Sequence, residues 1–171
     1  MRTTFESPIG ALTLLGDHDG TLTGVLFATT PYDGGEPDDP GALPAARRAF
    51  TRYFDGDPEA FTRLPLRFGG SPLQQEVWNA LIELPFGATT TYRELGSRLR
   101  PRLGAATSPR AVGSANARTP IPIVMACHRV IGSGGALTGY RGGLEVKRAL
   151  LAFEASGGDR DALREALRAA A

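Results

Sequence analysis

The sequence predicts a small α/β domain with a short antiparallel sheet, followed by a mostly helical, winged-helix-like domain that carries a helix-turn-helix. Residues 1–28 contain apolar and β-branched runs separated by turn signals, which is typical of short strands. Residues 70–156 contain apolar side chains at helical spacing behind clear helix starts. We therefore expect domains over residues 1–69 and 70–156, and a C-terminal tail over 157–171.

The first domain is expected to hold three antiparallel strands within residues 1–28. Residues 32–44 are rich in Gly, Pro and Asp and predict a loop, whereas residues 44–54 have the apolar spacing of a helix. Residues 64–68 are a candidate for a further strand. With 171 residues, of which 42% are hydrophobic, the chain is long enough to bury a core in each of two small domains.

The second domain begins with a strong helix signal, a serine N-cap followed by a proline at residues 71–72. A second helix is expected over about 90–99 and a third from 108–109 onward. Two short helices joined by a turn indicate a helix-turn-helix, and the small residues of the last helix would let its backbone approach a partner closely. The connection over 100–107 contains Pro, Gly and Ala, so we expect an enlarged, mobile loop there.

One more strong helix is expected over 144–153, where Lys147 and Glu154 fall on the same face. Considered alone, these two side chains would form an exposed pair on a helix surface. The tail contains leucines at helical spacing and predicts a marginal terminal helix.

Composition and charge narrow the class of protein. No apolar run is long enough to span a bilayer, and the N-terminus lacks the hydrophobic stretch of a signal peptide, so we expect a cytoplasmic protein. The formal net charge of +1 does not by itself indicate a nucleic-acid-binding protein. Residues 93–118 contain six arginines against one acidic residue, Glu94, which predicts either a local basic surface or an ordinary solvated face.

Cys127 is the single cysteine of the chain. It cannot form an internal disulfide, and with only His18 and His128 beside it there are too few soft ligands for a closed zinc site, so no metal is expected. Cys127 is therefore either a packed core residue or a reactive thiol. His128 can take the thiol proton if a carboxylate orients its ring, and Glu154 is the candidate carboxylate. Because adjacent side chains point apart, we expect a water to bridge the thiol and the imidazole.

Residues 121–154 contain the linked motifs Cys-His-Arg-Val, Leu-Thr-Gly-Tyr-x-Gly-Gly-Leu and Leu-Leu-x-x-Glu. Together with Arg110-Ala111-Val112-Gly113, Tyr92 and the helix that starts at Pro72, they resemble the O6-alkylguanine-DNA alkyltransferases over about half of the chain. The resemblance implies an N-terminal domain with a ribonuclease H-like core and a monomer that needs no cofactor. It also implies single-turnover repair, in which the alkyl group of O6-alkylguanine in double-stranded DNA passes irreversibly to a cysteine.

The resemblance also assigns roles to single residues. Cys127 is the alkyl acceptor, His128 the water-mediated base, and Glu154 the residue that orients this base. Arg110 is the finger that enters the duplex from the minor groove where the target guanine has been rotated out, and Tyr92 assists the rotation and donates to the flipped base. The resemblance further implies that four residues bind DNA or shape the pocket: Ala111, Val130, Tyr140 and Arg141. It implies that Thr119 and Lys147 support the site.

Two positions depart from the family pattern. Ala126 stands where the family most often has a proline before the cysteine, and losing the fixed φ of proline is expected to loosen the turn that aims the thiol. Thr119 stands where the family usually has an asparagine that ties the active-site turn to the recognition helix. A threonine supplies one hydroxyl but not the paired donor and acceptor groups of an amide.

Three other functions are compatible with the sequence alone. An alkyltransferase-like protein that binds the lesion without removing the alkyl group would generally lack the cysteine. A cysteine hydrolase would need an oxyanion hole and would release product steadily. A transcription regulator would use the two short helices to bind unmodified DNA in a sequence-specific way.

Overall fold

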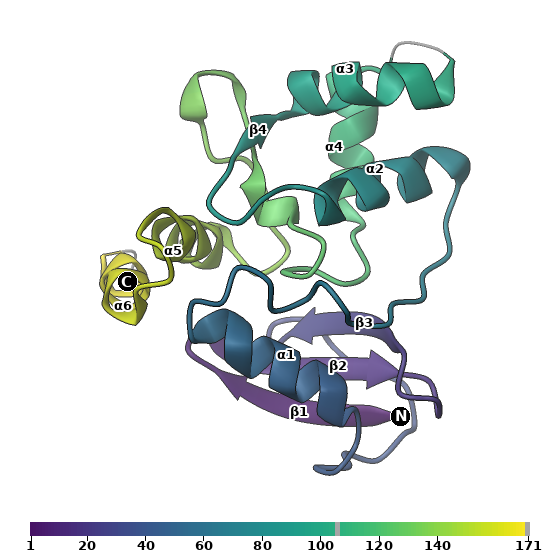
Figure 1. The fold of residues 1–171 in the computed structure, drawn as a ribbon, viewed down its shortest axis with the longest axis vertical. Helices are drawn as coiled ribbons and strands as arrows, with labels where there is room; N and C mark the ends of the chain where they lie inside the picture. The colour runs from purple at the N-terminus through teal and green to yellow at the C-terminus, as the bar shows by residue number, and fades with distance from the viewer. Residues whose placement is uncertain (105–106, 170–171) are drawn as a thin grey trace.

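The computed structural model describes residues 1–104 and 107–169, which form two parts stacked end to end (Figure 1). The N-terminal part contains a three-stranded sheet with one helix, and the C-terminal part contains the remaining helices. Within the described ranges, none of the helices combines the length and the apolar character that crossing a membrane requires.

The sheet confirms the prediction of three antiparallel strands in the N-terminal part. Its strands pair in the order β1 (Arg2–Ser7), β2 (Gly10–Gly16) and β3 (Leu22–Phe27). Alternate side chains of β1 and β2 are buried, as expected for a sheet covered on one face. The covering helix α1 spans Pro44–Phe54, as predicted, and packs Phe54 against Phe5 with 6.5 Å between the ring centroids.

The candidate strand over 64–68 is wrong. Leu66 makes a single bridge to Leu22, held by hydrogen bonds from Leu22 N to Pro65 O (2.9 Å) and from Arg67 N to Leu22 O (3.0 Å). Pro65 has no N–H to donate on one side of the bridge, and on the other side Val25 N donates to Pro120 O at 3.0 Å, so the ladder does not extend.

The C-terminal part begins with three helices: α2 (Pro72–Ile82), α3 (Tyr92–Leu103) and α4 (Pro109–Ala117). Ser71 caps α2 in a full capping box with Gln74, and Ser108 caps α4 through the backbone N–H of Ala111. Trp78 is 3% exposed and its indole N–H donates to Ala115 O at 3.0 Å, so it ties α2 to α4 from within the core.

The loop expected over 100–107 is shorter than predicted. Residues 100–103 continue α3, with Pro101 inside the helix, and Gly104 ends it in a left-handed conformation with a φ of 67°. The reason lies in tertiary packing, because Leu99 is buried and Leu103 packs partly against the same core. The predicted mobility concerns a stretch that falls partly on residues 105–106, which lie outside the described residues.

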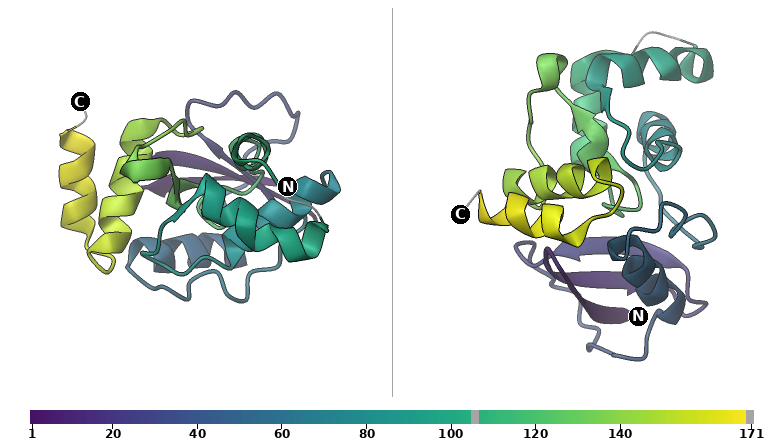
Figure 2. Two further views of the ribbon diagram at one scale, coloured as in Figure 1. Left: turned by 90° about the horizontal axis from the view of Figure 1, so that it is seen from above. Right: turned by 60° about the vertical axis from the view of Figure 1, so that its left-hand side comes forward.

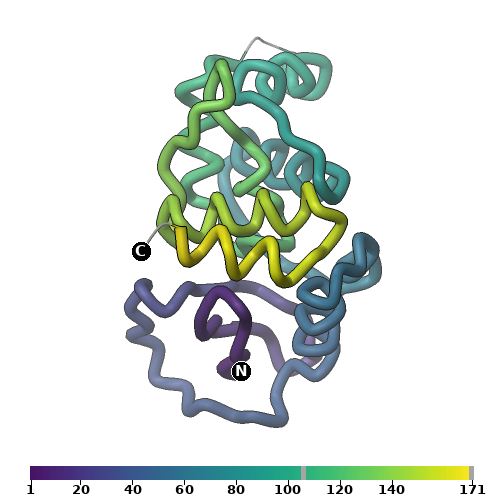
Figure 3. Tube along the Cα trace, turned by 90° about the vertical axis from the view of Figure 1, so that its left-hand side faces the viewer, coloured from purple at the N-terminus to yellow at the C-terminus, as the bar shows by residue number. Residues whose placement is uncertain are grey.

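The last part of the chain contains two short 3-10 helices, a short strand and two further helices. A buried segment leads into the 3-10 helix η1 (Cys127–Arg129) and into β5 (Val130–Ile131), which pairs in parallel with β4 (Thr90–Thr91). Residues 132–143, the rim loop, contain the short 3-10 helix η2 (Ser133–Gly135) and lead to α5 (Leu144–Ala155). The predicted terminal helix is present as α6 (Arg160–Arg168), which lies beside α5 with Leu163 fully buried (Figures 2 and 3).

Candidate active site

Residues 123–127 form an unusual turn, the Cys127 turn, which places Cys127. Ile123 has a φ of 76°, a left-handed conformation that costs a β-branched residue about 1–3 kcal/mol. Ala126 has a φ of −70° and a ψ of 53°, and the N–H of Cys127 donates to Met125 O at 2.6 Å, which closes an inverse γ-turn. The turn leaves Cys127 only 4% exposed, so the thiol is not freely open to solvent.

Glu154 is the centre of the buried polar network behind this turn. Its Oε1 accepts hydrogen bonds from His128 Nε2 (2.8 Å), Tyr53 Oη (2.7 Å) and Arg129 Nη2 (2.8 Å). Its Oε2 accepts from Arg129 Nε (2.7 Å) and from the backbone N–H of Gly87 (3.2 Å). Glu154 is only 3% exposed, and these donors replace the water that a buried carboxylate needs.

The network keeps Glu154 ionised. Burial alone would raise the pKa of Glu154, but hydrogen bonds from His128 and Arg129, together with the charge of Arg129, hold it well below its usual value. An ionised carboxylate can only accept hydrogen bonds, so His128 carries its proton on Nε2. The Nδ1 of His128 is then the basic nitrogen, and it is buried without a hydrogen-bond partner among the described residues.

The thiol of Cys127 is protonated in the free protein. Burial raises the pKa of Cys127 to about 11, while the contact with Thr119 and the charge of Lys147 act in the opposite direction. A thiol of this kind needs a base at the moment of reaction. The free Nδ1 of His128 follows directly in sequence, and no direct hydrogen bond joins it to Cys127 within the part of the chain that the structure describes.

Lys147 is buried in the wall of the site. It is fully buried, and its Nζ donates to Val130 O (2.7 Å) and to Thr138 O (3.1 Å), which joins α5 to β5 and to the rim loop. Burial lowers the pKa of Lys147, and the nearby Cys127 counteracts this. The interpretation of Lys147 and Glu154 as an exposed pair is therefore wrong, because both side chains point into the core that α5 shares with the Cys127 turn.

A small cavity of about 10 Å³ lies beside the thiol. It is lined by Asn116, Ala117, Thr119, Pro122, Cys127, Gly139, Tyr140 and Arg141. This volume holds about one water molecule. Two of the lining side chains carry buried polar atoms without a nitrogen or oxygen partner among the described residues, Oδ1 of Asn116 and Oη of Tyr140. Burial raises the pKa of Tyr140 well above its usual value.

The two departures from the family pattern are accommodated locally. The φ of Ala126, −70°, is the value that a proline would impose, and the N–H of Ala126 donates to Leu81 O at 3.4 Å. Ala126 therefore adopts the φ that a proline would impose, and the looser turn stays a prediction. The hydroxyl of Thr119 donates to Asn116 O at 2.8 Å, and Asn116 Nδ2 donates to Cys127 O at 3.4 Å. The link from α4 to the Cys127 turn is thus made by Asn116.

The residues expected to face DNA lie on a more open surface. Arg110 is exposed and Ala111 is partly buried at the start of α4, which runs from the end of α3 toward the Cys127 turn (Figure 1). Tyr92, at the start of α3, shares a 2.8 Å hydrogen bond with the hydroxyl of Thr138 in the rim loop. Arg141 is exposed and its Nη2 donates to Ala117 O at 3.2 Å, across the mouth of the cavity.

Sequence reasoning missed three residues of this site. Arg129 belongs to the Cys-His-Arg-Val motif, so the motif contained it, but its pairing with Glu154 was not predicted. Asn116 was the one amide among the small residues of its helix and could have been singled out for that reason. Tyr53 carried no sequence signal, because it lies 101 residues from the Glu154 that it contacts.

No group of three or more His, Cys, Asp and Glu side chains that could hold a metal ion occurs in residues 1–104 and 107–169.

Comparisons with known proteins match both parts of the chain. Residues 1–68 match the family description 6-O-methylguanine DNA methyltransferase, ribonuclease-like domain, and residues 72–156 match its DNA binding domain. A methylated-DNA--protein-cysteine methyltransferase of Mycobacterium bovis is 43% identical over 157 residues, which cover 90% of this chain and 91% of that protein. The protein of the same name in Haemophilus influenzae is 38% identical and covers 89% of this chain and 84% of that protein.

A solved structure resembles the whole fold. The crystal structure of Mycobacterium tuberculosis OGT in complex with DNA superposes with a TM-score of 0.83 at 40% identity, covering 95% of this chain and 98% of that one. The ribonuclease-like sheet, the helical DNA-binding part and the extent of the matches agree with one another. The chain therefore belongs to the 6-O-methylguanine DNA methyltransferase family.

Proposed function

We propose that this protein repairs alkylated double-stranded DNA by direct reversal, moving the alkyl group from O6 of guanine to Cys127 once per molecule. The observation that carries the proposal is that Cys127 is followed directly by His128, whose Nε2 is held by the ionised carboxylate of Glu154 (Nε2 to Oε1, 2.8 Å), which leaves Nδ1 free. The relatives named methylated-DNA--protein-cysteine methyltransferase support the same chemistry.

The proposed reaction is a displacement at the alkyl carbon. The thiol proton passes to Nδ1 of His128 through a bridging water, and the sulfur of Cys127 then attacks the alkyl carbon. The carbon–O6 bond breaks as the sulfur–carbon bond forms, and its electron pair remains on the guanine oxygen. A hydrogen bond from Tyr92 to the departing base stabilises the developing charge. The thioether product is not hydrolysed, so one molecule of protein repairs one lesion.

DNA would be held by the surface that α3 and α4 present. Arg110 enters the duplex in place of the rotated guanine, Ala111 lets the helix backbone approach the DNA, and the basic residues between 93 and 118 contact phosphates. The flipped base needs far more room than the small cavity beside Cys127 provides. The rim loop, with Tyr140 and Arg141, therefore has to move away from α4 when the base enters.

The remaining site residues support this pocket. The backbone near Val130 would shape it once the base has entered, Thr119 holds the end of α4, and Lys147 holds the rim loop. The transfer needs no cofactor, and one copy of the chain supplies all proposed groups. The protein would act in a compartment that contains the DNA and keeps thiols reduced, as the cytoplasm does.

The proposal is tested by intact-protein mass spectrometry after incubation with a duplex oligonucleotide containing O6-methylguanine. We expect one methyl group per protein, mapped to the peptide with Cys127, and none in the Cys127→Ser variant. Unmodified DNA of the same sequence is the second control. Tight binding to the modified duplex without any methyl adduct would instead indicate a lesion-binding protein, and steady release of product would indicate a hydrolase.

A further inference from the structure

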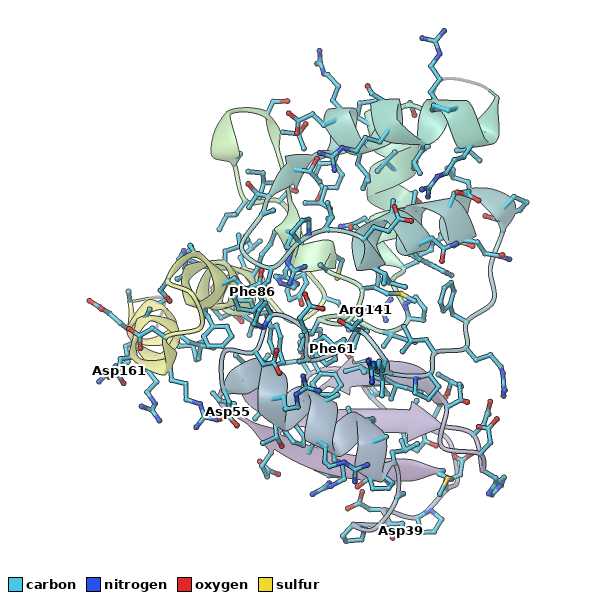
Figure 4. The ribbon with its side chains drawn as sticks, in the orientation of Figure 1. Asp39, Asp55, Phe61, Phe86, Arg141 and Asp161 are labelled. Carbon is cyan, nitrogen blue, oxygen red and sulfur yellow. The ribbon has the colours of Figure 1, made fainter. Side chains whose placement is uncertain are left out.

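Tyr53 brings a polar group of the N-terminal domain to the centre of the proposed catalytic network. It lies in the last turn of α1, is 1% exposed, and its hydroxyl donates to Glu154 Oε1 at 2.7 Å. Every other donor to this carboxylate comes from the C-terminal domain, in η1 or in the turn before β4. Two of the aromatic neighbours of Tyr53, Phe61 and Phe86, lie between α1 and the helical part (Figure 4).

Packing alone does not explain a hydroxyl at this position. The ring of Tyr53 lies among other aromatic rings, with centroid distances of 5.1 to 5.9 Å. These neighbours are Phe54, Phe61, Phe86 and Phe153. A phenylalanine would fill the same space, whereas a hydroxyl buried among such rings is unfavourable unless it is hydrogen bonded. The carboxylate of Glu154 satisfies that hydroxyl.

The hydroxyl stays protonated and can only serve as a donor here. Burial raises the pKa of Tyr53 well above its usual value, and the charge of Glu154 adds to this. The oxygen that it contacts is Oε1, the same atom that accepts the proton of His128 Nε2. Rotation of the carboxylate away from His128 would therefore break the Tyr53 hydrogen bond as well.

We propose that Tyr53 is a positioning residue for alkyl transfer: its hydroxyl holds Oε1 of Glu154 against His128, and so keeps the imidazole aimed at Cys127. The proposal rests on the proposed function and extends it to the N-terminal domain, which thereby contributes directly to the geometry of the base. A displacement of α1 relative to the helical part would reach His128 through this contact.

The test is the Tyr53→Phe variant, which keeps the ring and removes only the hydroxyl. We expect the single-turnover rate of methyl transfer at saturating DNA to fall about fivefold, the equivalent of one net hydrogen bond, with unchanged DNA affinity. The second readout is the proton NMR signal of the His128 Nε2–H, which reports its bond to Glu154 and requires no activity. The chain has two histidines, so the signal is assigned with a His18→Gln variant.

Two controls separate positioning from packing. Tyr32→Phe removes the hydroxyl of a partly buried tyrosine whose exposed hydrogen bond goes to Glu36, so it should change neither readout. Phe54→Leu disturbs the same aromatic cluster without removing a hydroxyl, so it should lower the thermal stability and leave the His128 signal in place. A Tyr53→Phe protein that is less stable but has the wild-type His128 signal would overturn the proposal.

The outcomes also distinguish this proposal from the proposed function. If the wild-type protein forms no methyl adduct, the proposed function fails and the role of Tyr53 in transfer fails with it. If the wild-type protein transfers methyl groups and Tyr53→Phe leaves both the rate and the His128 signal unchanged, only the positioning role is overturned. A slower rate together with a shifted signal supports it.

Discussion

The buried half of the site and its DNA-facing half are organised in opposite ways. Behind Cys127, the polar groups of Glu154, His128 and Arg129 hold one another in the free protein, and Glu154 alone accepts five hydrogen bonds. On the other half, Arg110 is exposed, and no hydrogen bond or ion pair of its side chain occurs within the described ranges. The chemistry is thus preorganised, whereas the DNA contacts are completed by the ligand. Substitutions in the buried half should change both the stability and the rate of alkyl transfer. Substitutions in the DNA-facing half should change the affinity for DNA alone.

The largest effect on stability is expected for Arg129→Met, which removes the main counter-charge of buried Glu154. Breaking a buried ion pair at one partner costs about 3–5 kcal/mol of unfolding free energy. Urea denaturation measures it, with the exposed Arg118→Met as the matched control, for which we expect almost no change. A loss below about 1 kcal/mol for Arg129→Met would mean that the network is not the preorganised unit described here.

The next effect is the pH dependence of stability that Cys127 causes. Because the folded protein raises the pKa of this thiol from 9.0 to about 11, it keeps the proton in a range where the unfolded chain loses it. The stabilisation is complete below pH 9 and is lost as the pH rises to 11, by roughly 2–3 kcal/mol. The difference between wild type and Cys127→Ala in denaturation curves over this range isolates it. If the unfolding free energies of the two proteins changed with pH in the same way, the thiol would not be held in its neutral form.

Arg110→Ala tests the DNA-facing half. We expect a loss of about 1–3 kcal/mol in binding to the modified duplex, measured by fluorescence anisotropy, because a base-level contact is removed. The unfolding free energy should stay within about 0.5 kcal/mol of the wild type, because the side chain is exposed. Arg168→Ala on α6 provides the control and should change neither quantity. A large loss of stability with Arg110→Ala would contradict the division between the two halves.

The smallest effect is expected for Ala126→Pro, next to Cys127 and between the buried and the DNA-facing half of the site. The φ of −70° already suits proline, which would stabilise the folded protein by lowering the conformational entropy of the unfolded chain. The hydrogen bond from Ala126 N to Leu81 O would be lost at the same time. These opposing terms leave a net change within about 1 kcal/mol. Ala80→Pro, inside α2, is the control and should cost about 3 kcal/mol or more. A similar loss at Ala126 would indicate that the γ-turn depends on that N–H.

The local signals of the sequence predicted much of the fold. Ser71 and Ser108 cap the helices that they were expected to start, and the strands within residues 1–28 pair as predicted. These features depend on neighbouring residues, so a short window contains their cause. The errors have a different origin. Residues 100–103 look like loop, but Leu99 and Leu103 have a core to pack against, and this contact extends the helix through Pro101.

The candidate site shows the same division. The sequence alone predicts which groups carry chemistry: a single cysteine followed by a histidine, and a glutamate at the end of the next strong helix. It also contains the linked motifs that resemble the alkyltransferases. The packing of distant segments, in contrast, buries Lys147 and Glu154 and lets Asn116 replace the missing amide link to Cys127. It alone placed the hydroxyl of Tyr53 on Glu154. The reason is that burial and hydrogen bonding between distant segments depend on how helices and sheet pack, and no local pattern encodes a contact between residues about a hundred positions apart.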